Sequence, residues 1–116
     1  MDQMAVIERY FVHMTNGDAA AVASLFMEDA TLATPDGREF TGRPAIGAMY
    51  AALLAAQRPL PHRVAQVMGE RAVAFEIEGR LPDGTPTKTA NFFFFTEDGL
   101  IQRVSAYRRD IRSEQT

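Results

Sequence analysis

Apolar side chains recur every three or four residues at the start of the chain, a spacing that predicts an amphipathic helix. Asp2 is placed to cap the N-terminus of this helix, and Asn16-Gly17 ends it. The residues expected on its buried face are Met4, Ile7, Tyr10, Phe11 and Met14. We therefore expect the segment to pack against a core through one side only.

A second helix is expected to follow, because Asp18 is a good N-cap and apolar residues continue after it. Its inner side carries Val22, Leu25 and Phe26. Glu28-Asp29 breaks this pattern, and residues 30–34 then predict a short strand. Pro35-Asp36-Gly37 is a strong turn sequence, after which residues 40–41 resume an extended piece.

A third helix is predicted to begin at Gly42-Arg43-Pro44, since proline is well tolerated in the first turn of a helix. Its apolar stripe consists of Ile46, Met49, Tyr50, Leu53 and Leu54. Pro59 and Pro61 are expected to end this helix, because the residue before a proline is disfavoured in helical conformation.

From His62 onward the pattern changes to the alternation that is typical of strands. Val64 and Val67 are three residues apart, so a bulge is expected between them, before a turn near Gly69-Glu70. The next strand has one apolar face, formed by Val73, Phe75 and Ile77. A hairpin connection at residues 81–84 then leads into the longest strand.

Four consecutive phenylalanines, residues 92–95, lie within this longest strand. Because successive side chains of a strand point to opposite faces, both faces must be covered. We expect helices on one face, and a second subunit or another sheet on the other. A Thr-Glu-Asp-Gly turn then leads into a last strand, which runs to about Ile111.

Three helices combined with an antiparallel meander predict an α+β fold, with the helices packed on one face of a curved sheet. Such a sheet, antiparallel or mixed, wraps around the helices as a cone whose open end is a natural pocket. The chain has 116 residues, which corresponds to one domain. We expect this domain to span residues 1–112, with a loose tail at 113–116.

Composition argues against several classes of function. No apolar run approaches the roughly 20 residues of a membrane span, and no secretory signal begins the chain. The chain lacks cysteine, and its two histidines lie too far apart in sequence to suggest a metal site. The net charge of −3 disfavours nucleic acid as a partner. We therefore expect a cytoplasmic protein without metal, cofactor, nucleic-acid or membrane partner.

Two segments carry a family resemblance: Gly-Asp-Ala-Ala-Ala-Val-Ala-Ser-Leu-Phe-Met-Glu-Asp-Ala-Thr at residues 17–31, and Phe-Thr-Gly-Arg-Pro-Ala-Ile at residues 40–46. Together with the order of elements, they resemble the nuclear transport factor 2-like superfold, and within it the SnoaL-like and ketosteroid isomerase branch. The resemblance covers nearly the whole chain and implies a cystatin-like α+β barrel. It implies the fold more specifically than the function, because the superfold also hosts hydratases, hydrolases, cyclases and binding modules.

The resemblance implies roles for three residues. In the isomerase family, a tyrosine on the first helix donates to the developing oxyanion, and Tyr10 matches it. A second tyrosine on the third helix supports the first by hydrogen bonding, and Tyr50 matches that one. The other donor of the family is a protonated aspartic acid on the long strand, and Asn91 occupies its position. Purely structural hydrogen bonding is the alternative for both Tyr10 and Asn91.

The family's general base is a carboxylate just before a proline, a position that Thr34 and Pro35 match here. A threonine hydroxyl cannot take a proton from carbon at neutral pH, and a general base is worth on the order of 10²–10⁴ in rate. Asp36 is an alternative base, although Pro-Asp-Gly is equally explained as a turn. His62 is either a base or a residue that decorates the rim of the cone.

The cavity of the cone is expected to be lined by Phe26, Met49, Phe75, Phe93 and Val104. If Arg108 turns inward, it would favour an anionic ligand. We expect a small apolar carbonyl or phenolic ligand, and isomerisation through an enolate with water, Asp36 or the substrate itself as the base. The alternatives are a binding module without catalysis and a dimerisation unit with a filled cone. Phe92 and Phe94 on the outer face favour a homodimer in each case.

Overall fold

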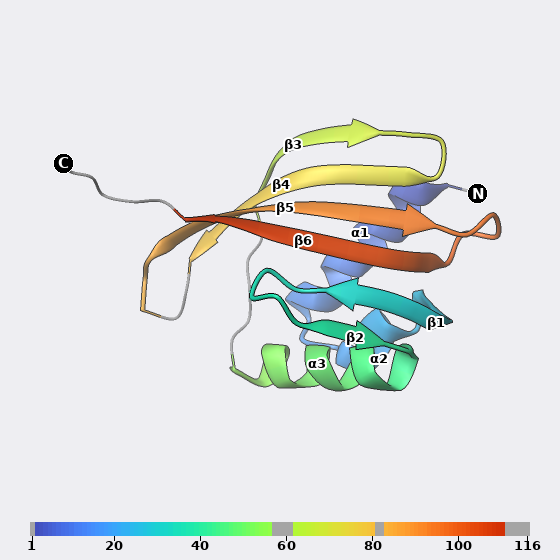
Figure 1. Cartoon of the computed structure of the whole chain (residues 1–116), viewed down its shortest axis with the longest axis horizontal. Helices are drawn as coiled ribbons and strands as arrows, with labels where there is room; N and C mark the ends of the chain where they lie inside the picture. Colours follow the sequence, from blue (N-terminus) through green and yellow to red (C-terminus); the bar gives the residue numbers. More distant parts are fainter. Residues whose placement is uncertain (1, 57–61, 81–82, 111–116) are drawn as a thin grey trace.

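The computed structural model describes residues 2–56, 62–80 and 83–110 (Figure 1). Its elements in chain order are α1 (Gln3–Thr15), α2 (Ala19–Ala23), β1 (Phe26–Ala33), β2 (Glu39–Thr41), α3 (Arg43–Ala56), β3 (His62–Met68), β4 (Ala72–Arg80), β5 (Pro86–Phe95) and β6 (Ile101–Asp110). The predicted helix stop at Pro59 and Pro61, the start of the hairpin at residues 81–82 and the tail at 113–116 lie outside the described residues.

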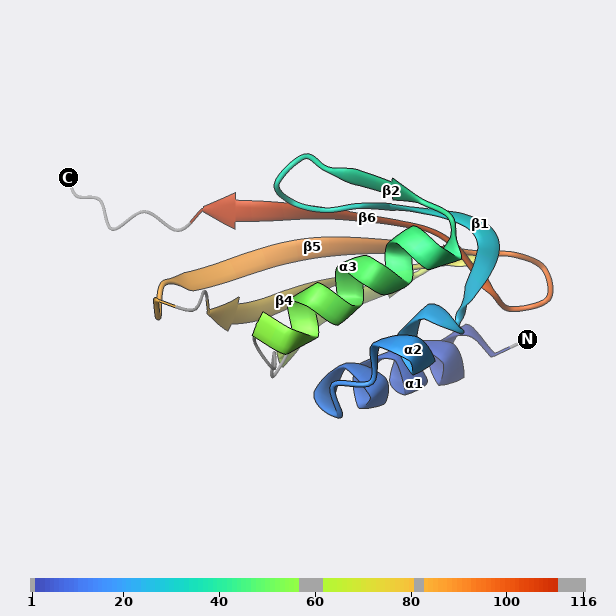
Figure 2. The same ribbon diagram turned by 90° about the horizontal axis from the view of Figure 1, so that it is seen from below.

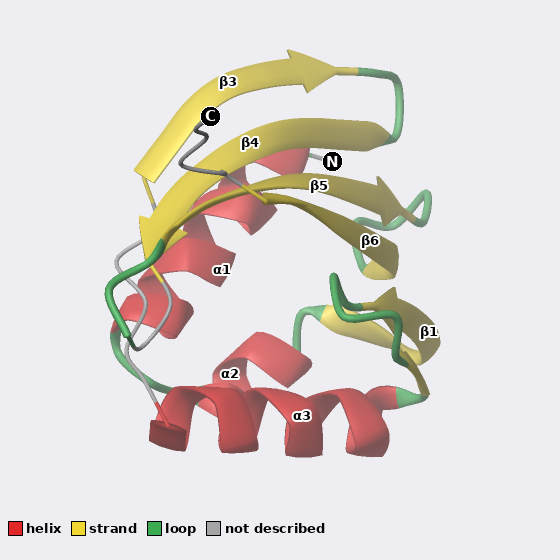
Figure 3. Ribbon diagram, turned by 60° about the vertical axis from the view of Figure 1, so that its left-hand side comes forward, coloured by secondary structure: helices red, strands yellow, loops and turns green. Residues whose placement is uncertain are grey.

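The six strands form one curved sheet in the order β2-β1-β6-β5-β4-β3. Neighbouring strands run antiparallel except β1 and β6, which are parallel. The helices lie on the concave side, and the sheet bends over them without closing (Figures 2 and 3). The predicted α+β fold, with a curved mixed sheet around three helices, is confirmed. None of the described helices is long and apolar enough to cross a membrane.

Local sequence sets the helix boundaries as predicted. The Asp2 side chain accepts hydrogen bonds from the first-turn backbone N–H groups of α1, and the Asp18 side chain accepts one from Ala21 in α2. Gly17 has a φ of 70°, a left-handed conformation that glycine adopts without strain, and it separates the two helices.

The second helix is shorter than predicted. It ends at Ala23, and Phe26, which was expected on its inner side, is instead the first residue of β1. Glu28-Asp29, expected to end a helix, lies inside that strand. The reason is long-range pairing: Ile101 of β6 donates its N–H to the Leu25 carbonyl and pairs in register with Phe26. These contacts are non-local, so helical spacing alone does not reveal them.

A bulge bends β1. Phe26 pairs with Ile101 and Thr31 pairs with Arg103, so an advance of five residues along β1 matches an advance of only two along β6. Residues at the start of α3 satisfy two carbonyls of the bulge: Arg43 donates through Nε (3.1 Å) and Nη2 (2.5 Å) to Phe26, and Gly42 donates its N–H to Ala30 (2.8 Å). An arginine is electrostatically unfavourable at a helix N-terminus, so this position reflects its hydrogen bonds.

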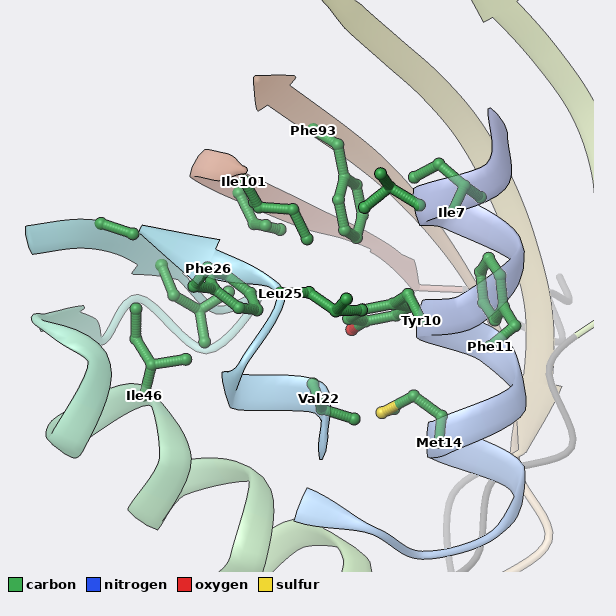
Figure 4. Packing of buried hydrophobic residues seen from close by; sticks show 14 of the residues in the cluster. Ile7, Tyr10, Phe11, Met14, Val22, Leu25, Phe26, Ile46, Phe93 and Ile101 are labelled. Atoms are coloured by element: carbon green, nitrogen blue, oxygen red, sulfur yellow. The ribbon is translucent and has the colours of Figure 1, made fainter. Parts of the chain in front are cut away.

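The four phenylalanines alternate between the two faces of β5 as predicted. Phe93 and Phe95 are buried against the helices, whereas Phe92 and Phe94 lie on the outer face. Figure 4 shows the side chains that meet between α1, α3 and the sheet. The fully buried ones include Ile7, Val22, Phe26, Ile46, Val73, Phe93 and Ile101. β3 also contains an irregularity, but the register shift lies between Arg63 and Ala65 and not between Val64 and Val67 as expected.

Candidate functional site

The centre of the candidate site is a pair of tyrosines from two different helices. Tyr10 lies on the buried face of α1, and Tyr50 lies on the buried face of α3. Their hydroxyl oxygens are 2.6 Å apart, and the two residues are only 7% and 3% exposed. The hydrogen bond that the family resemblance implied is therefore present. In Figure 4 Tyr10 extends from α1 toward Leu25 and Phe93 in the middle of the core.

Burial keeps both hydroxyls neutral. It raises the pKa of Tyr10 from 10.0 to about 12, an effect that the hydrogen bond with Tyr50 partly offsets. The pKa of Tyr50 is raised well above its ordinary value, first by burial and then by its proximity to Tyr10. One hydroxyl proton is used within the pair. No acceptor among the described residues takes the second proton, which leaves the pair able to donate to a ligand oxygen.

Aromatic rings surround the tyrosine pair. The Tyr10 ring makes edge contacts with Phe11, Tyr50 and Phe93, at centroid distances of 5.3, 5.9 and 5.0 Å. Phe75 stacks on Phe93 at 5.3 Å, and Phe26 lies 6.0 Å from Tyr50. The predicted lining residues from these strands are thus brought together around the tyrosines. They pack directly on one another as part of the core, and the open cavity that they were expected to line is not found among them.

Asn91 lies on the same sheet face as Phe93, two residues away along β5. Two residues span about 7 Å of strand, so Asn91 is the next residue on this face of β5 after the phenylalanine that contacts Tyr10. The Asn91 side chain is half-buried and donates one of its two N–H protons to the Thr89 hydroxyl, at 3.1 Å. Its second proton and its carbonyl oxygen make no further hydrogen bond within the described chain.

Beyond the aromatic cluster, the inner face of the sheet is less completely covered. Ile77, Asn91 and Ala106 are half-buried, although the registers place them on the same face as buried Phe93. Arg108 pairs in register with Thr89, so the sheet places it on this inner face as well, at an exposed position. Val104 pairs with Phe93 and is buried. The concave face therefore changes from apolar to polar along β5 and β6.

Thr34, which the family resemblance matched to the position of the base, is bonded within its own turn. Its hydroxyl donates to Asp36 Oδ1, and its backbone N–H donates to the Arg38 carbonyl at 2.9 Å. The hydrogen bond from Thr34 is the main reason why the pKa of Asp36 lies below its ordinary value. Asp36 is exposed and also pairs with Arg38, at 2.9 Å. An ionised, solvated carboxylate of this kind is a weak base for a C–H proton.

A second turn in the chain explains these bonds. Residues 96–100 repeat the Thr-x-Asp-Gly pattern of residues 34–38, and the Thr96 hydroxyl donates to Asp98. The Thr96 N–H donates to the Leu100 carbonyl at 2.8 Å, as Thr34 does to its own partner. This second turn joins β5 to β6 at the opposite end of the sheet (Figure 1). The same sequence thus builds the same turn far from the tyrosines.

Two hollows in the described surface lie away from the tyrosines. One of about 560 Å³ lies between α3 and β2, and another of about 400 Å³ lies on the outer face of the sheet. Neither is lined by Tyr10, Tyr50 or Asn91. Met49, expected to line the inner cavity, lines the hollow beside β2, because its side chain lies toward the edge of α3 and not toward its buried face.

Sequence reasoning gave Arg43 no role, although it fixes the strand that carries Phe26. The available signal was its charge, since a cation in the first turn of a helix needs a compensating partner. His62 is exposed at the start of β3. Among residues 2–56, 62–80 and 83–110, no three histidine, aspartate or glutamate side chains are grouped as metal ligands.

The sequence matches the family described as the SnoaL-like domain over residues 7–104, so the chain belongs to this family. No curated protein sequence matches it.

Solved structures show the same fold at low sequence identity. The epoxide hydrolase/cyclase-like enzyme SalBIII is 20% identical, with a TM-score of 0.79 over 92% of this chain and 90% of its own. A steroid delta-isomerase from Pseudomonas aeruginosa is 18% identical, with a TM-score of 0.79 over 94% and 80%. A Methylobium petroleophilum protein with a cystatin-like fold is 19% identical, with a TM-score of 0.80 over 98% and 80%. Further similar structures are described as NTF2-like.

Alkaline titration should reveal the buried pair. The pKa of Tyr10 is about 12 in the folded chain against 10.0 ordinarily, so between these values the unfolded chain loses a proton that the folded chain keeps. Stability should therefore fall as pH rises from 10 to 12. The double variant Tyr10→Phe/Tyr50→Phe should reduce this fall by roughly 1.4 kcal/mol for each pKa unit removed.

Denaturant unfolding followed by fluorescence or circular dichroism measures the effect across that pH range. Tyr107→Phe, which removes an exposed hydroxyl, is the matched control and should leave the slope unchanged. If the free energy of unfolding fell equally with pH in the wild type and the double variant, the raised pKa values assigned to the tyrosine pair would be contradicted.

Proposed function

We propose that this chain binds a small, largely apolar carbonyl or phenolic compound on the inner face of its sheet, and that the aromatic side chains packed around the tyrosine pair move apart to admit the ligand oxygen. The observation that carries the proposal is the hydrogen bond between Tyr10 and Tyr50, which is buried and uncharged. Two coupled hydroxyls hold one proton more than their mutual bond uses. In an apolar setting, donation of that proton to a carbonyl or phenolate oxygen is strong, since water does not compete for it.

Asn91 supports the same proposal as a second donor. It lies two residues from Phe93 on the same face of β5, and it has one amide proton beyond its bond to Thr89. An amide does not ionise in the physiological range, so its contribution to binding does not depend on pH. A carbonyl oxygen placed between the two groups would accept from both, as an oxyanion site requires.

The half-buried surface next to the aromatic cluster supplies the apolar contact for such a ligand. Ala106 pairs in register with Asn91, Ile77 pairs with Thr89 two residues earlier in β5, and the side chains of Ala106, Asn91 and Ile77 are all incompletely covered. A ligand there would complete the burial of the inner face. Arg108, farther along the same face, would favour a ligand with an anionic end in this direction.

Enolate-type isomerisation is the reaction for which these donors are suited. A base would remove a proton from the carbon next to the carbonyl, the electron pair would move onto the oxygen, and the proton would return at another carbon. Tyr10 and Asn91 would stabilise the oxyanion. The fold is shared with a steroid delta-isomerase and a cyclase-like enzyme, which is consistent with this chemistry. In this chain a bound water, Asp36 or the substrate itself would have to serve as the base.

Binding without catalysis is the second candidate function, and the turn at residues 34–38 favours it. Thr34 stands where the family has its carboxylate, and its hydroxyl is directed to Asp36. The chain would then have the donors of an isomerase without its base. A module of this kind would hold its ligand unchanged.

We also propose that two copies associate through the outer face of the sheet. Phe92 and Tyr107 make an edge contact there at 6.0 Å, yet remain 39% and 60% exposed. Val67 is 68% exposed and reaches the same face through its register with Ala74 and Phe92. Aromatic and aliphatic side chains that are grouped and exposed favour a contact between identical surfaces.

Ligand binding tests the main proposal. A titration with steroid 3-ketones and two-ring phenols should raise the melting temperature, and calorimetry should give a dissociation constant. Tyr10→Phe and Asn91→Ala should each weaken binding about tenfold, because each removes a hydrogen-bond donor from a desolvated oxygen. Gln102→Ala, which removes an exposed amide from the outer face of the sheet, is the matched control and should bind as the wild type does. Absence of any ligand effect, or equal affinity in all variants, would refute the proposal.

Catalysis can be tested by restoring the base. The wild type should convert a 3-keto-Δ5 steroid slowly or not at all. Thr34→Asp in an Asp36→Asn background, which avoids repulsion between neighbouring carboxylates, should accelerate conversion by on the order of 10² or more. Ultraviolet absorbance of the conjugated ketone measures the rate, and Asp36→Asn alone is the control. A double variant that binds the steroid without converting it would contradict an isomerase-competent site.

Self-association has its own test. Sedimentation at micromolar concentration should report a dimer for the wild type and a monomer for Phe92→Glu, since a charge would be buried in the contact. Val12→Glu alters an exposed apolar residue on α1, away from the sheet, and should remain dimeric. A monomeric wild type would rule out this assembly.

A further inference from the structure

The hollow of about 400 Å³ on the outer face is chemically unlike the inner site. It lies where β6 meets β1 and β5, on the face of the sheet opposite the aromatic cluster. Its lining consists of Met27, Asp29, Thr31, Phe94, Gln102 and Arg103. Two opposite charges, two uncharged polar groups and two apolar side chains thus border one concave surface.

Two irregularities of the sheet coincide at this hollow. The β1 bulge, between Phe26 and Thr31, lies on one side of Gln102. On the other side, consecutive residues Phe94 and Phe95 pair with Arg103 and Ile101, so that Gln102 is passed over. Gln102 consequently has no register partner in either neighbouring strand. Because bulges redirect side chains and interrupt a flat surface, the hollow follows from the backbone itself.

Arg103 is held in place at the edge of this hollow. Its Nε donates to the Ser105 hydroxyl at 3.2 Å, and its guanidinium carbon lies 5.1 Å from the centre of the Phe94 ring. These contacts fix the plane of the guanidinium while leaving its two terminal nitrogens for other acceptors. A carboxylate is the acceptor that this fork fits best, since it receives two parallel hydrogen bonds.

Asp29 supplies the opposite charge from the bulged part of β1. It is exposed, and it forms no ion pair with Arg103. The ion pairs found within the described chain join other residues: Arg38 with Asp36, Arg63 with Glu8, and Lys88 with Glu78. Opposite charges that border one hollow without contacting each other leave room for a ligand that carries both charges.

We propose that this hollow binds a small zwitterion, an α-amino acid with an apolar side chain. Its carboxylate would lie against the guanidinium of Arg103, and its ammonium group against the carboxylate of Asp29. Its apolar side chain would rest on Met27 and Phe94, the latter already in contact with Arg103. This site is independent of the tyrosine pair, because the two lie on opposite faces of the sheet.

The test compares three ligands that differ only in charge: phenylalanine, 3-phenylpropionate, which lacks the ammonium group, and phenethylamine, which lacks the carboxylate. Chemical-shift titration of the labelled protein gives the three affinities. Phenylalanine should bind about tenfold more tightly than either analogue, because each charge adds a charge-assisted hydrogen bond. The resonances that shift should be those of the hollow.

Two substitutions should remove this preference selectively. Asp29→Asn should make phenylalanine bind no better than 3-phenylpropionate, and Arg103→Gln should make it bind no better than phenethylamine. Glu28→Gln and Arg109→Gln neutralise neighbouring exposed charges outside the hollow, and should leave the affinity unchanged. Tyr10→Phe should also leave it unchanged, which separates this site from the inner one.

Several results would overturn the proposal. These are no binding of phenylalanine at millimolar concentration, equal affinity for all three ligands, or unchanged selectivity in both variants. Since the hollow shares its face with the proposed contact between copies, the titration is repeated on Phe92→Glu, which should still bind. Loss of binding in that variant would mean that the site is not formed by a single chain, and would overturn the assignment as well.

Discussion

The hydrogen bond between Tyr10 and Tyr50 is the interaction on which the rest of the structure depends. It joins α1 to α3 in the middle of the core, where no water competes for either hydroxyl. Each oxygen would be costly to bury alone, and each satisfies the other. The surrounding phenylalanines raise the pKa values that keep the pair neutral. The same packing that stabilises the fold therefore also keeps a neutral hydrogen-bond donor inside an apolar core.

A second constraint acts on the sheet. β1 must run parallel to β6, yet its end must turn so that Phe26 reaches the core beside Tyr50. The bulge makes this turn possible, and Arg43 holds it from the start of α3. The bulge has a second consequence on the opposite face, where it opens the hollow that Asp29 borders. One backbone irregularity thus shapes both surfaces of the sheet.

The turns at residues 34–38 and 96–100 have the same sequence pattern and the same hydrogen bonds, so these bonds at Thr34 do not indicate a catalytic role. Thr34 and Thr96 make the same bonds in turns of the same sequence pattern at opposite ends of the sheet. A residue whose contacts are fully explained by its turn gives no evidence of catalysis. The tyrosine pair has no such local explanation, since its partners are 40 residues apart. The tyrosine pair is therefore stronger evidence for a functional role than the hydroxyl of Thr34.

Much of the fold could be predicted because the signals were local. The caps at Asp2 and Asp18, the turn at residues 34–37 and the alternation of the phenylalanines depend on residues within a few positions of one another. The hydrogen bond between the two tyrosines was predicted from the family resemblance, because the spacing of apolar residues alone identifies Tyr10 and Tyr50 only as core residues. These are features that short-range geometry and side-chain chemistry determine directly.

The sequence by itself determined the α+β class, the turns, and which residues face the helices. Only the tertiary structure decided that Phe26 belongs to a strand, that β1 and β6 run parallel, and that Asp29 and Arg103 border one hollow. Each of these depends on two segments, about 70 residues apart in sequence, that meet at the bulge between Phe26 and Thr31. A periodic pattern reports which face of a segment is buried, but it does not report which segment covers that face.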